Sequence, residues 1–187
     1  SYWPAIQRIC DKYGILLVSD EVICGFGRTG HWFGCERFGY KPDLMTFAKG
    51  VTSGYVPLGG VMVGDRVAKV LIEQGGEFEH GYTYSGHPVA CAAGLATLEL
   101  LKRDNLIEQS ANLAPVLEQA IHGLKGTKHV VDIRNCGLTG ALQLAPRDGD
   151  AVIRPFEAGI KLPFPRPGRR RPGQGSRLSA GSRGIVS

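Results

Sequence analysis

The order of the elements that the sequence predicts indicates an α/β fold. A short, almost entirely apolar run at residues 15–22 follows a helical pattern, and a second such run occupies residues 44–48. Short apolar runs are typical of strands that are buried on both faces of a parallel sheet. Helices that alternate with such strands predict helices layered on a sheet. The chain has 187 residues, 43% of them hydrophobic, which is enough for one domain with its own core.

The first predicted helix leads directly into the first strand. Pro4 suits the first turn of a helix, where the N–H that proline lacks would have no partner. The apolar residues that then recur at helical spacing are Ile6, Ile9, Cys10 and Tyr13. Gly14 ends this helix, and the apolar run begins at the next residue.

Charged residues follow both predicted strands. Asp20 and Glu21 stand near the end of the first strand, and Lys49 follows the second. Open α/β sheets bind their ligands at the carboxyl ends of the strands. Lysine is seldom buried without a task, and an amine in apolar surroundings is a nucleophile towards aldehydes. Pyridoxal phosphate requires a lysine for its aldehyde and a carboxylate facing its ring nitrogen, so Asp20 and Lys49 predict a site for this cofactor. Taken singly, each could be an ordinary surface charge.

A glycine-rich loop at residues 25–30, GFGRTG, matches the pattern GxGxxG. In a dinucleotide site this pattern opens a helix, whereas here the following stretch is broken by Gly34, Gly39 and Pro42. No second strand ending in an acid follows at the required distance. We therefore interpret the loop as a turn near the site and not as a nicotinamide site.

The middle of the chain predicts one more buried strand and two helices. The strand covers residues 56–63, and Asp65 is a candidate cap for a short helix after it. Pro88 suits the start of the next helix, which is apolar nearly all round through residue 101, as in a fully buried helix.

The last patterned stretch begins with a capping signal, in which Glu108 follows Asn105 by three residues. An apolar stripe from Ile107 to Leu124 predicts a helix, with a kink at Pro115. Two strand-like segments follow, at residues 129–134 and 138–144.

Composition excludes several other classes of protein. Residues 161–187 hold seven basic residues and no acid, which leaves 15 basic against 17 acidic residues in the rest of the chain. This balance argues against a nucleic-acid-binding protein. No apolar stretch is long enough for a membrane helix, and no secretory signal pattern is present. The five cysteines lack CxxC spacing, which indicates reduced thiols in a cytoplasmic protein, and His80 and His87 lack a third ligand, so no metal site is expected.

Three separated motifs resemble the class III pyridoxal-phosphate-dependent aminotransferases. They are Asp20-Glu21-Val22 with GFGRTG, KPDLMTFAKG with VPLGG, and HGYTYSGHP. The similarity spans about residues 1–160 and is greatest to ω-amino acid–pyruvate and polyamine–pyruvate aminotransferases. It implies fold type I of the pyridoxal-phosphate-dependent transferases, an α/β fold with a mostly parallel sheet.

The resemblance also implies a division of the chain. Residues 1–104 would be the C-terminal part of the large cofactor-binding domain, and residues 105–160 a connecting helix and the start of the small C-terminal domain. Residues 161–187 are rich in Arg, Pro and Gly without periodicity. Such a segment does not bury enough apolar surface to order itself. Because this composition starts abruptly, we also expect that the segment was read out of frame, with a genuine basic tail as the alternative.

The resemblance assigns roles to four residues. Lys49 would form the bond to the cofactor and later act as the base, and Asp20 would face the pyridine nitrogen. Val22 would pack on one face of the ring, although ordinary core packing is equally compatible. Thr83 matches the position that binds the cofactor phosphate of the neighbouring subunit, although a threonine among glycines is otherwise a common turn residue. These roles imply a homodimer or higher homo-oligomer with shared sites.

The reaction implied is transfer of an amino group from an ω-amine or ω-amino acid to pyruvate or another keto acid. Two alternatives stay open, a class III aminomutase and a catalytically incomplete fragment. The family's glycine/serine phosphate loop, its ring-stacking aromatic residue and its substrate-binding arginine have no match in this sequence. The identity of the amine is therefore left open.

Overall fold

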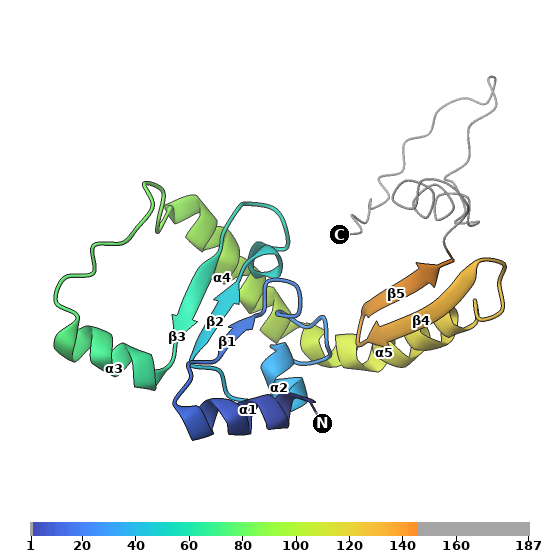
Figure 1. Ribbon diagram of the computed structural model, residues 1–187. Coiled ribbons are helices and arrows are strands. Elements are labelled where there is room, and N and C mark those ends of the chain that lie inside the picture. Colours follow the sequence, from blue (N-terminus) through green and yellow to red (C-terminus); the bar gives the residue numbers. More distant parts are fainter. Residues whose placement is uncertain (1, 146–187) are drawn as a thin grey trace, which may run out of the picture. The chain divides into compact units, whose positions relative to one another are not determined.

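A three-stranded sheet organises the first half of the computed structural model (Figure 1), which describes residues 2–145. Its strands are β1 (Val18–Asp20), β2 (Leu44–Phe47) and β3 (Gly60–Val63), in the order β1-β2-β3. β1 and β2 are parallel, whereas β3 runs antiparallel to β2. The expected mostly parallel sheet is therefore, within the described residues, a sheet with one parallel and one antiparallel pair of strands.

Five α-helices, one short 3₁₀ helix and a second, two-stranded sheet complete the described residues. The helices are α1 (Tyr2–Tyr13), α2 (Gly34–Phe38), α3 (Asp65–Gln74), α4 (Pro88–Arg103) and α5 (Leu106–His122), with the 3₁₀ helix η1 (Lys49–Thr52) after β2. The second sheet pairs β4 (Val130–Cys136) with β5 (Thr139–Leu144). Residues 2–143 form one compact unit. None of the helices within residues 2–145 is long and apolar enough to cross a membrane.

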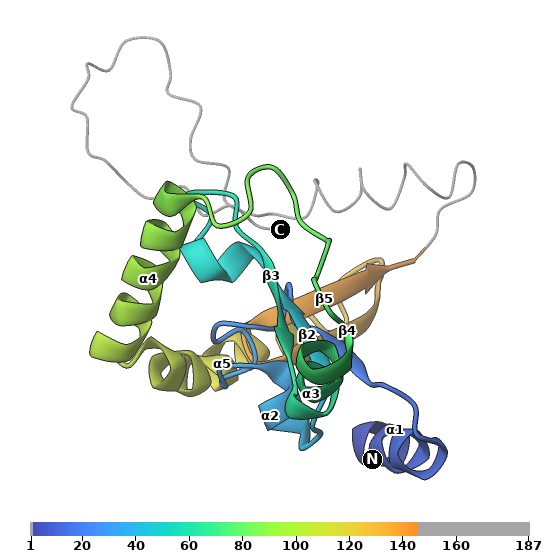
Figure 2. The ribbon, with the colours of Figure 1, turned by 90° about the vertical axis from the view of Figure 1, so that its left-hand side faces the viewer.

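Helix α4 packs on η1 through small residues. Figure 2 shows α4 beside the sheet and followed directly by α5. The buried residues of α4 are Ala90, Gly94 and Thr97. A Cβ atom at Gly94 would lie only 3.0 Å from Leu58, so the absence of a side chain lets the helix approach the segment after η1. This contact fixes the turn that begins at Lys49 against a long helix.

The predicted order of helices and strands is confirmed, but the short helix α2 was not predicted. The sequence prediction relied on Gly34 and Gly39 as breakers. Gly34 is the first residue of α2, and Gly39 ends the helix in the left-handed conformation, with φ of +66°. The N–H groups at the start of α2 are bound by a carboxylate from β1 (see below), which is a tertiary contact that local sequence patterns do not reveal.

Two capping predictions were wrong in detail. Gly64, and not Asp65, occupies the N-cap of α3, and Asp65 is the first helical residue. Asn105 is the N-cap of α5, but its backbone is left-handed and its side chain makes no capping bond. Pro115 lies inside α5, which continues without a break to His122.

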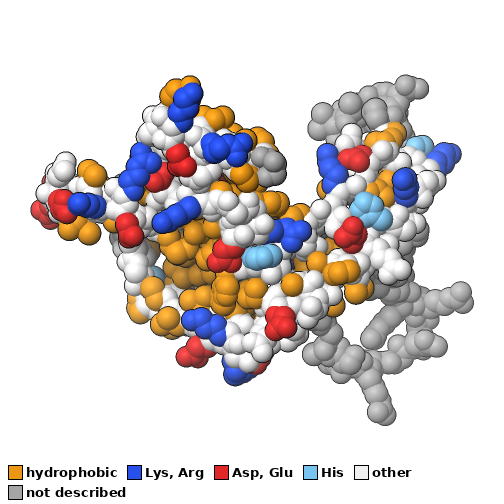
Figure 3. Space-filling model, turned by 90° about the horizontal axis from the view of Figure 1, so that it is seen from below, with side chains coloured by type: hydrophobic (Ala, Val, Ile, Leu, Met, Phe, Trp, Pro, Cys, Tyr) orange, Lys and Arg blue, Asp and Glu red, His pale blue; other side chains and the backbone are white. Residues whose placement is uncertain are grey.

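Burial is less complete than the apolar runs predicted. Val18 in β1 is 53% exposed, Val61 in β3 is 56% exposed, and Leu95 in α4 is 65% exposed. Seen from below, hydrophobic side chains gather in a hollow of the surface (Figure 3). The described residues therefore cover one face of these elements and leave the other open.

The glycine-rich loop packs against α5 and the turn between β4 and β5. The hydroxyl of Ser110 donates a hydrogen bond to the carbonyl of Gly27, and the N–H of Leu138 donates to the carbonyl of Arg28 at 2.7 Å. A Cβ at Gly30 would lie 3.1 Å from the Cα of Ala111. These glycines are needed because backbone and helix meet closely here.

The division at residues 104–105 stays a prediction. Residues 106–145 carry α5 and the β4–β5 sheet, and they lie in the same compact unit as the first sheet up to residue 143. The segment 161–187, with its predicted disorder and shifted frame, and the end of the predicted small-domain segment from residue 146 lie outside the described residues.

The close approach at Gly30 makes a testable prediction about stability. Gly30→Ala should lower the free energy of unfolding by about 3 kcal/mol, since a left-handed φ of +81° and contact with the backbone of α5 both oppose a side chain. Gly14→Ala is the matched control, because φ is +68° there and nothing lies within 4 Å. We expect that control to lose about 1 kcal/mol. Urea unfolding of the full-length protein measures both, and equal losses would contradict the packing argument.

Candidate active site

Asp20 is the last residue of β1, and only one of its two carboxylate oxygens accepts hydrogen bonds from the described residues. Its Oδ1 accepts hydrogen bonds from the N–H of Val22 at 3.1 Å and from the hydroxyl of Thr46 at 3.2 Å. Thr46 is also its register partner on β2. Within residues 2–145, Oδ2 has no hydrogen-bond partner, and the side chain is exposed. The carboxylate is thus oriented from one side while its second oxygen faces open space.

Lys49 follows β2 at the same edge of the sheet. Because β1 and β2 are parallel and Asp20 pairs with Thr46, both strands end side by side. Lys49 begins η1 and adopts a left-handed backbone, with φ of +47°. Its amine has no hydrogen bond or ion pair with any described residue, and its side chain is exposed. Lys49 therefore follows the strand that pairs with the strand ending in Asp20, whereas the expected apolar pocket is not formed by the described residues.

Val22 and Thr83 occupy different settings. β1 ends at Asp20, so Val22 lies outside the strand. Val22 is half-buried in a turn, and its N–H binds Asp20. Thr83 lies in an exposed turn between α3 and α4. No hydrogen bond within the described residues joins Thr83 to Asp20 or Lys49.

Glu21 is a buried carboxylate to which the sequence analysis gave no role. It is only 1% exposed. Its oxygens accept hydrogen bonds from the N–H groups of Gly34 and Cys35, both at 2.8 Å, and from the hydroxyl of Ser19 at 3.1 Å. Because Ser19 donates its proton to Glu21, the hydroxyl of Tyr40, 2.7 Å away, donates to Ser19. Two acids in succession at a strand end were the available signal, since alternation directs one of them inward.

The charge of Glu21 affects the ionisable groups around it. Burial raises the pKa of the Cys35 thiol, and the Glu21 carboxylate raises it further. The pKa of Cys24 is raised by the same two causes in the same order. Burial also raises the pKa of Tyr40, and the Glu21 carboxylate raises it further. All three groups are therefore held in their neutral forms beside one buried anion.

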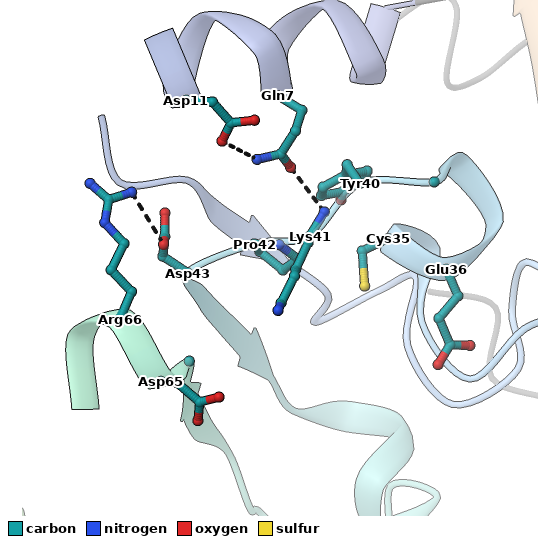
Figure 4. Close-up of a pocket in the computed structure, with 12 residues that line it drawn as sticks. Gln7, Asp11, Cys35, Glu36, Tyr40, Lys41, Pro42, Asp43, Asp65 and Arg66 are labelled. Atoms are coloured by element: carbon teal, nitrogen blue, oxygen red, sulfur yellow. Dashed lines mark hydrogen bonds and ion pairs between the residues drawn. The ribbon is translucent and has the colours of Figure 1, made fainter. Parts of the chain in front are cut away.

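A separate cavity of about 690 Å³ lies at the opposite edge of the sheet. Asp43, just before β2, and Arg66 in α3 form an ion pair of 3.4 Å on its wall. Figure 4 shows Gln7 between two hydrogen-bond partners: its side-chain N–H donates to the carboxylate of Asp11, and its side-chain oxygen accepts from the backbone N–H of Lys41. Since Asp20 and Lys49 lie at the carboxyl ends of their strands, this cavity is distinct from the candidate site. Within residues 2–145, no group of three His, Cys, Asp or Glu side chains is arranged to hold a metal ion.

Comparison with known proteins identifies the family. Residues 1–162 match the family described as aminotransferase class-III. The chain belongs to the class III aminotransferases. It is 57% identical over 166 residues to the beta-alanine–pyruvate aminotransferase of Pseudomonas aeruginosa, covering 86% of this chain and 37% of that protein. It is 51% identical over 145 residues to the putrescine–pyruvate aminotransferase of the same organism, covering 77% of this chain and 32% of that protein.

A solved structure supports the same fold. The crystal structure of the omega transaminase from Pseudomonas jessenii, in complex with PMP, is 37% identical, with a TM-score of 0.78. The match covers 84% of this chain and 37% of that one. The fold is therefore part of fold type I of the pyridoxal-phosphate-dependent transferases, as predicted. This class III aminotransferase sequence spans about a third of the length of the relatives it matches.

The contacts of Glu21 predict a cost for removing its charge. Glu21→Gln should destabilise the full-length protein by about 2 kcal/mol, since an amide group would leave one buried N–H without an acceptor. Glu36→Gln, on the exposed side of α2, is the control and should change stability by less than about 0.5 kcal/mol. Urea unfolding followed by circular dichroism measures both variants. Equal stability of the two variants would refute the role of Glu21 in joining β1 to α2.

Proposed function

We propose that this sequence forms part of a pyridoxal-phosphate-dependent transaminase that moves an amino group from an ω-amine or ω-amino acid to pyruvate or another keto acid. The observation that carries the proposal is the placement of Asp20 and Lys49 at one edge of two neighbouring parallel strands. The names of the two relatives described above, which use β-alanine and putrescine with pyruvate, support the class of substrates.

The side chains at this edge fit the cofactor chemically. Pyridoxal phosphate carries an aldehyde, which a free amine attacks, and a ring nitrogen, which a carboxylate binds when it is protonated. Within residues 2–145, the amine of Lys49 has no hydrogen-bond or ion-pair partner, and Oδ2 of Asp20 has no hydrogen-bond partner. Both groups are therefore available to the cofactor. The complex of the Pseudomonas jessenii enzyme with PMP supports the same group of cofactors.

In this proposal each side chain has a separate task. The bound cofactor would supply an aldehyde carbon that accepts the amino group and a ring that withdraws electrons. Lys49 would hold that carbon in the resting enzyme and, once released, would take the proton from the substrate carbon that bears the amino group. The free oxygen of Asp20 would accept a hydrogen bond from the protonated ring nitrogen, while the bonds from Val22 and Thr46 keep the carboxylate in orientation. Val22 would contact one face of the ring.

The proposed working unit is a homodimer or a higher homo-oligomer with shared sites. Thr83 would bind the cofactor phosphate of the neighbouring subunit. Its place in an exposed turn, without a hydrogen bond to Asp20 or Lys49, supports a task outside its own subunit's site. We further propose a cytoplasmic protein, since all five cysteines are free thiols.

The first prediction of this proposal concerns Lys49. Borohydride reduction of the full-length holoenzyme, followed by peptide mapping, should place the pyridoxyl group on the peptide that contains Lys49. Lys49→Ala should lower kcat by more than about 10⁴-fold, because the attachment point and the base are lost together. Lys69→Ala, an exposed change on α3, should retain normal labelling and activity. Recovery of the label on another lysine would refute the assignment.

The second prediction concerns the shared site. Full-length Lys49→Ala and Thr83→Ala subunits should each be inactive or nearly so alone. When the two are mixed under conditions of subunit exchange, activity should return to roughly a quarter of the wild-type value, since half of the dimers are mixed and have one intact site of two. The measurement is activity after exchange, with hybrid dimers verified by native mass spectrometry. Hybrids that remain inactive would contradict the shared site.

A further inference from the structure

Phe26, in the glycine-rich loop, has an unusual backbone conformation. Its φ is +60°, in the left-handed region that few residues other than glycine adopt. Its N–H donates a hydrogen bond of 2.7 Å to the carbonyl of Trp32, which closes the loop. Buried glycines, Gly25 and Gly27, stand on either side of it. A strained backbone conformation of this kind persists only where the surrounding contacts stabilise it, and such conformations cluster at functional sites.

The side chain of Phe26 lies against the turn that carries Lys49. A Cβ atom at Gly50 would lie 3.1 Å from the Cβ of Phe26 and 3.2 Å from its Cδ2. On the other side, the rings of Phe26 and Phe47 meet edge to face, with centroids 6.1 Å apart. Gly50 directly follows Lys49, and Phe47 precedes it by two residues. Phe26 therefore contacts the chain on both sides of Lys49.

Lys49 itself is held in a left-handed conformation, with φ of +47°. The turn that follows it is closed by backbone hydrogen bonds from Val51 to Ala48 and from Gly54 to Lys49, both of 3.3 Å, and from Ser53 to Gly50, of 3.1 Å. Two of these three bonds exceed about 3.2 Å, the upper end of the usual range, so they constrain the conformation of Lys49 weakly. The aromatic contact with Gly50 and Phe47 supplies the additional constraint.

We propose that Phe26 is a positioning residue that holds the turn of Lys49, and so directs its amine toward the site of the reaction. The inference rests on the function proposed for Lys49. Phe26 comes six residues after Asp20, so one short segment joins the residue that faces the ring nitrogen to the residue that binds the aldehyde. The ring does not touch reacting atoms, and it acts through the backbone on either side of the lysine.

The space at Gly50 gives the proposal a sharp test. Gly50→Ala should push the Phe26 ring away and displace the turn, and Phe26→Ala should leave it unsupported. In the double variant, alanine at position 26 removes the contacts of the new methyl group with Cδ2 and Cγ of the ring, but it keeps the Cβ at 3.1 Å, so part of the strain remains. Because both changes act on the same contact, their combined effect should be smaller than the sum of the two single effects.

The measurements use the full-length enzyme and begin before catalysis. The rate at which the apoenzyme binds pyridoxal phosphate covalently is followed by absorbance. A displacement on the order of 1 Å changes rates by about 100-fold, so Phe26→Ala and Gly50→Ala should slow attachment by about 10- to 100-fold. Phe26→Tyr, which keeps the ring, should attach the cofactor at nearly the wild-type rate. Phe38→Leu, in a separate aromatic cluster with Trp3, is the control for loss of an aromatic side chain elsewhere.

The outcomes separate this inference from the proposed function. Wild-type enzyme labelled by borohydride at a residue other than Lys49 would refute the function itself. With Lys49 labelled, additive effects of the two changes, or wild-type attachment by Phe26→Ala, would refute the role of Phe26. The role of Phe26 is supported if Phe26→Ala attaches the cofactor more slowly and Phe26→Tyr attaches it at nearly the wild-type rate. It is also supported if the pH dependence of the bound cofactor's absorbance changes only in the Phe26 and Gly50 variants. If Phe26→Ala does not fold, Phe26→Leu replaces it in the same comparison, and the same two outcomes decide.

Discussion

The buried carboxylate of Glu21 is the contact on which the candidate site depends. It accepts two N–H groups at the start of α2, and so joins the end of β1 to a helix more than ten residues further along the chain. A buried anion requires such partners, because an unpaired charge in the interior is strongly unfavourable. With Glu21 directed inward, strand geometry directs the neighbouring Asp20 to the opposite face. The inward acid therefore determines where the outward acid lies.

The two faces at the end of β1 have different requirements. On the inner face, Ser19, Glu21 and Tyr40 form a closed chain of hydrogen bonds, and the nearby thiols stay protonated. On the outer face, Asp20 retains one free oxygen, and Lys49 retains a free amine. The inward residues Ser19 and Glu21 thus contribute to stability, whereas the outward residue Asp20 keeps an oxygen free for binding. Each side can meet its own requirement because consecutive residues of a strand point in opposite directions.

Sequence patterns predicted the elements and the edge at which Asp20 and Lys49 meet, because both depend on local periodicity and on strand direction. They did not predict α2, since its start depends on Glu21, thirteen residues before Gly34. They also did not predict the exposed faces of β1 and α4, because apolar runs report a preference for burial and not which neighbours provide it. The position of Phe26 against Gly50 was likewise beyond reach, since no local pattern relates these two residues. The roles of Val22 and Thr83 came from family resemblance, and the structure leaves them as proposals.

The glycine-rich loop explains why so many tertiary contacts converge on one short segment. Gly27 and Gly30 let the loop lie against α5, and Arg28 accepts a backbone bond from the turn before β5. Between Gly25 and Gly27, Phe26 points instead toward Gly50 and Phe47. Because glycines tolerate the backbone angles that the loop requires, it can bind a helix on one side and support the lysine turn on the other. The pattern GxGxxG serves here to bring protein backbone close to protein backbone, whereas in dinucleotide sites it brings backbone close to a phosphate.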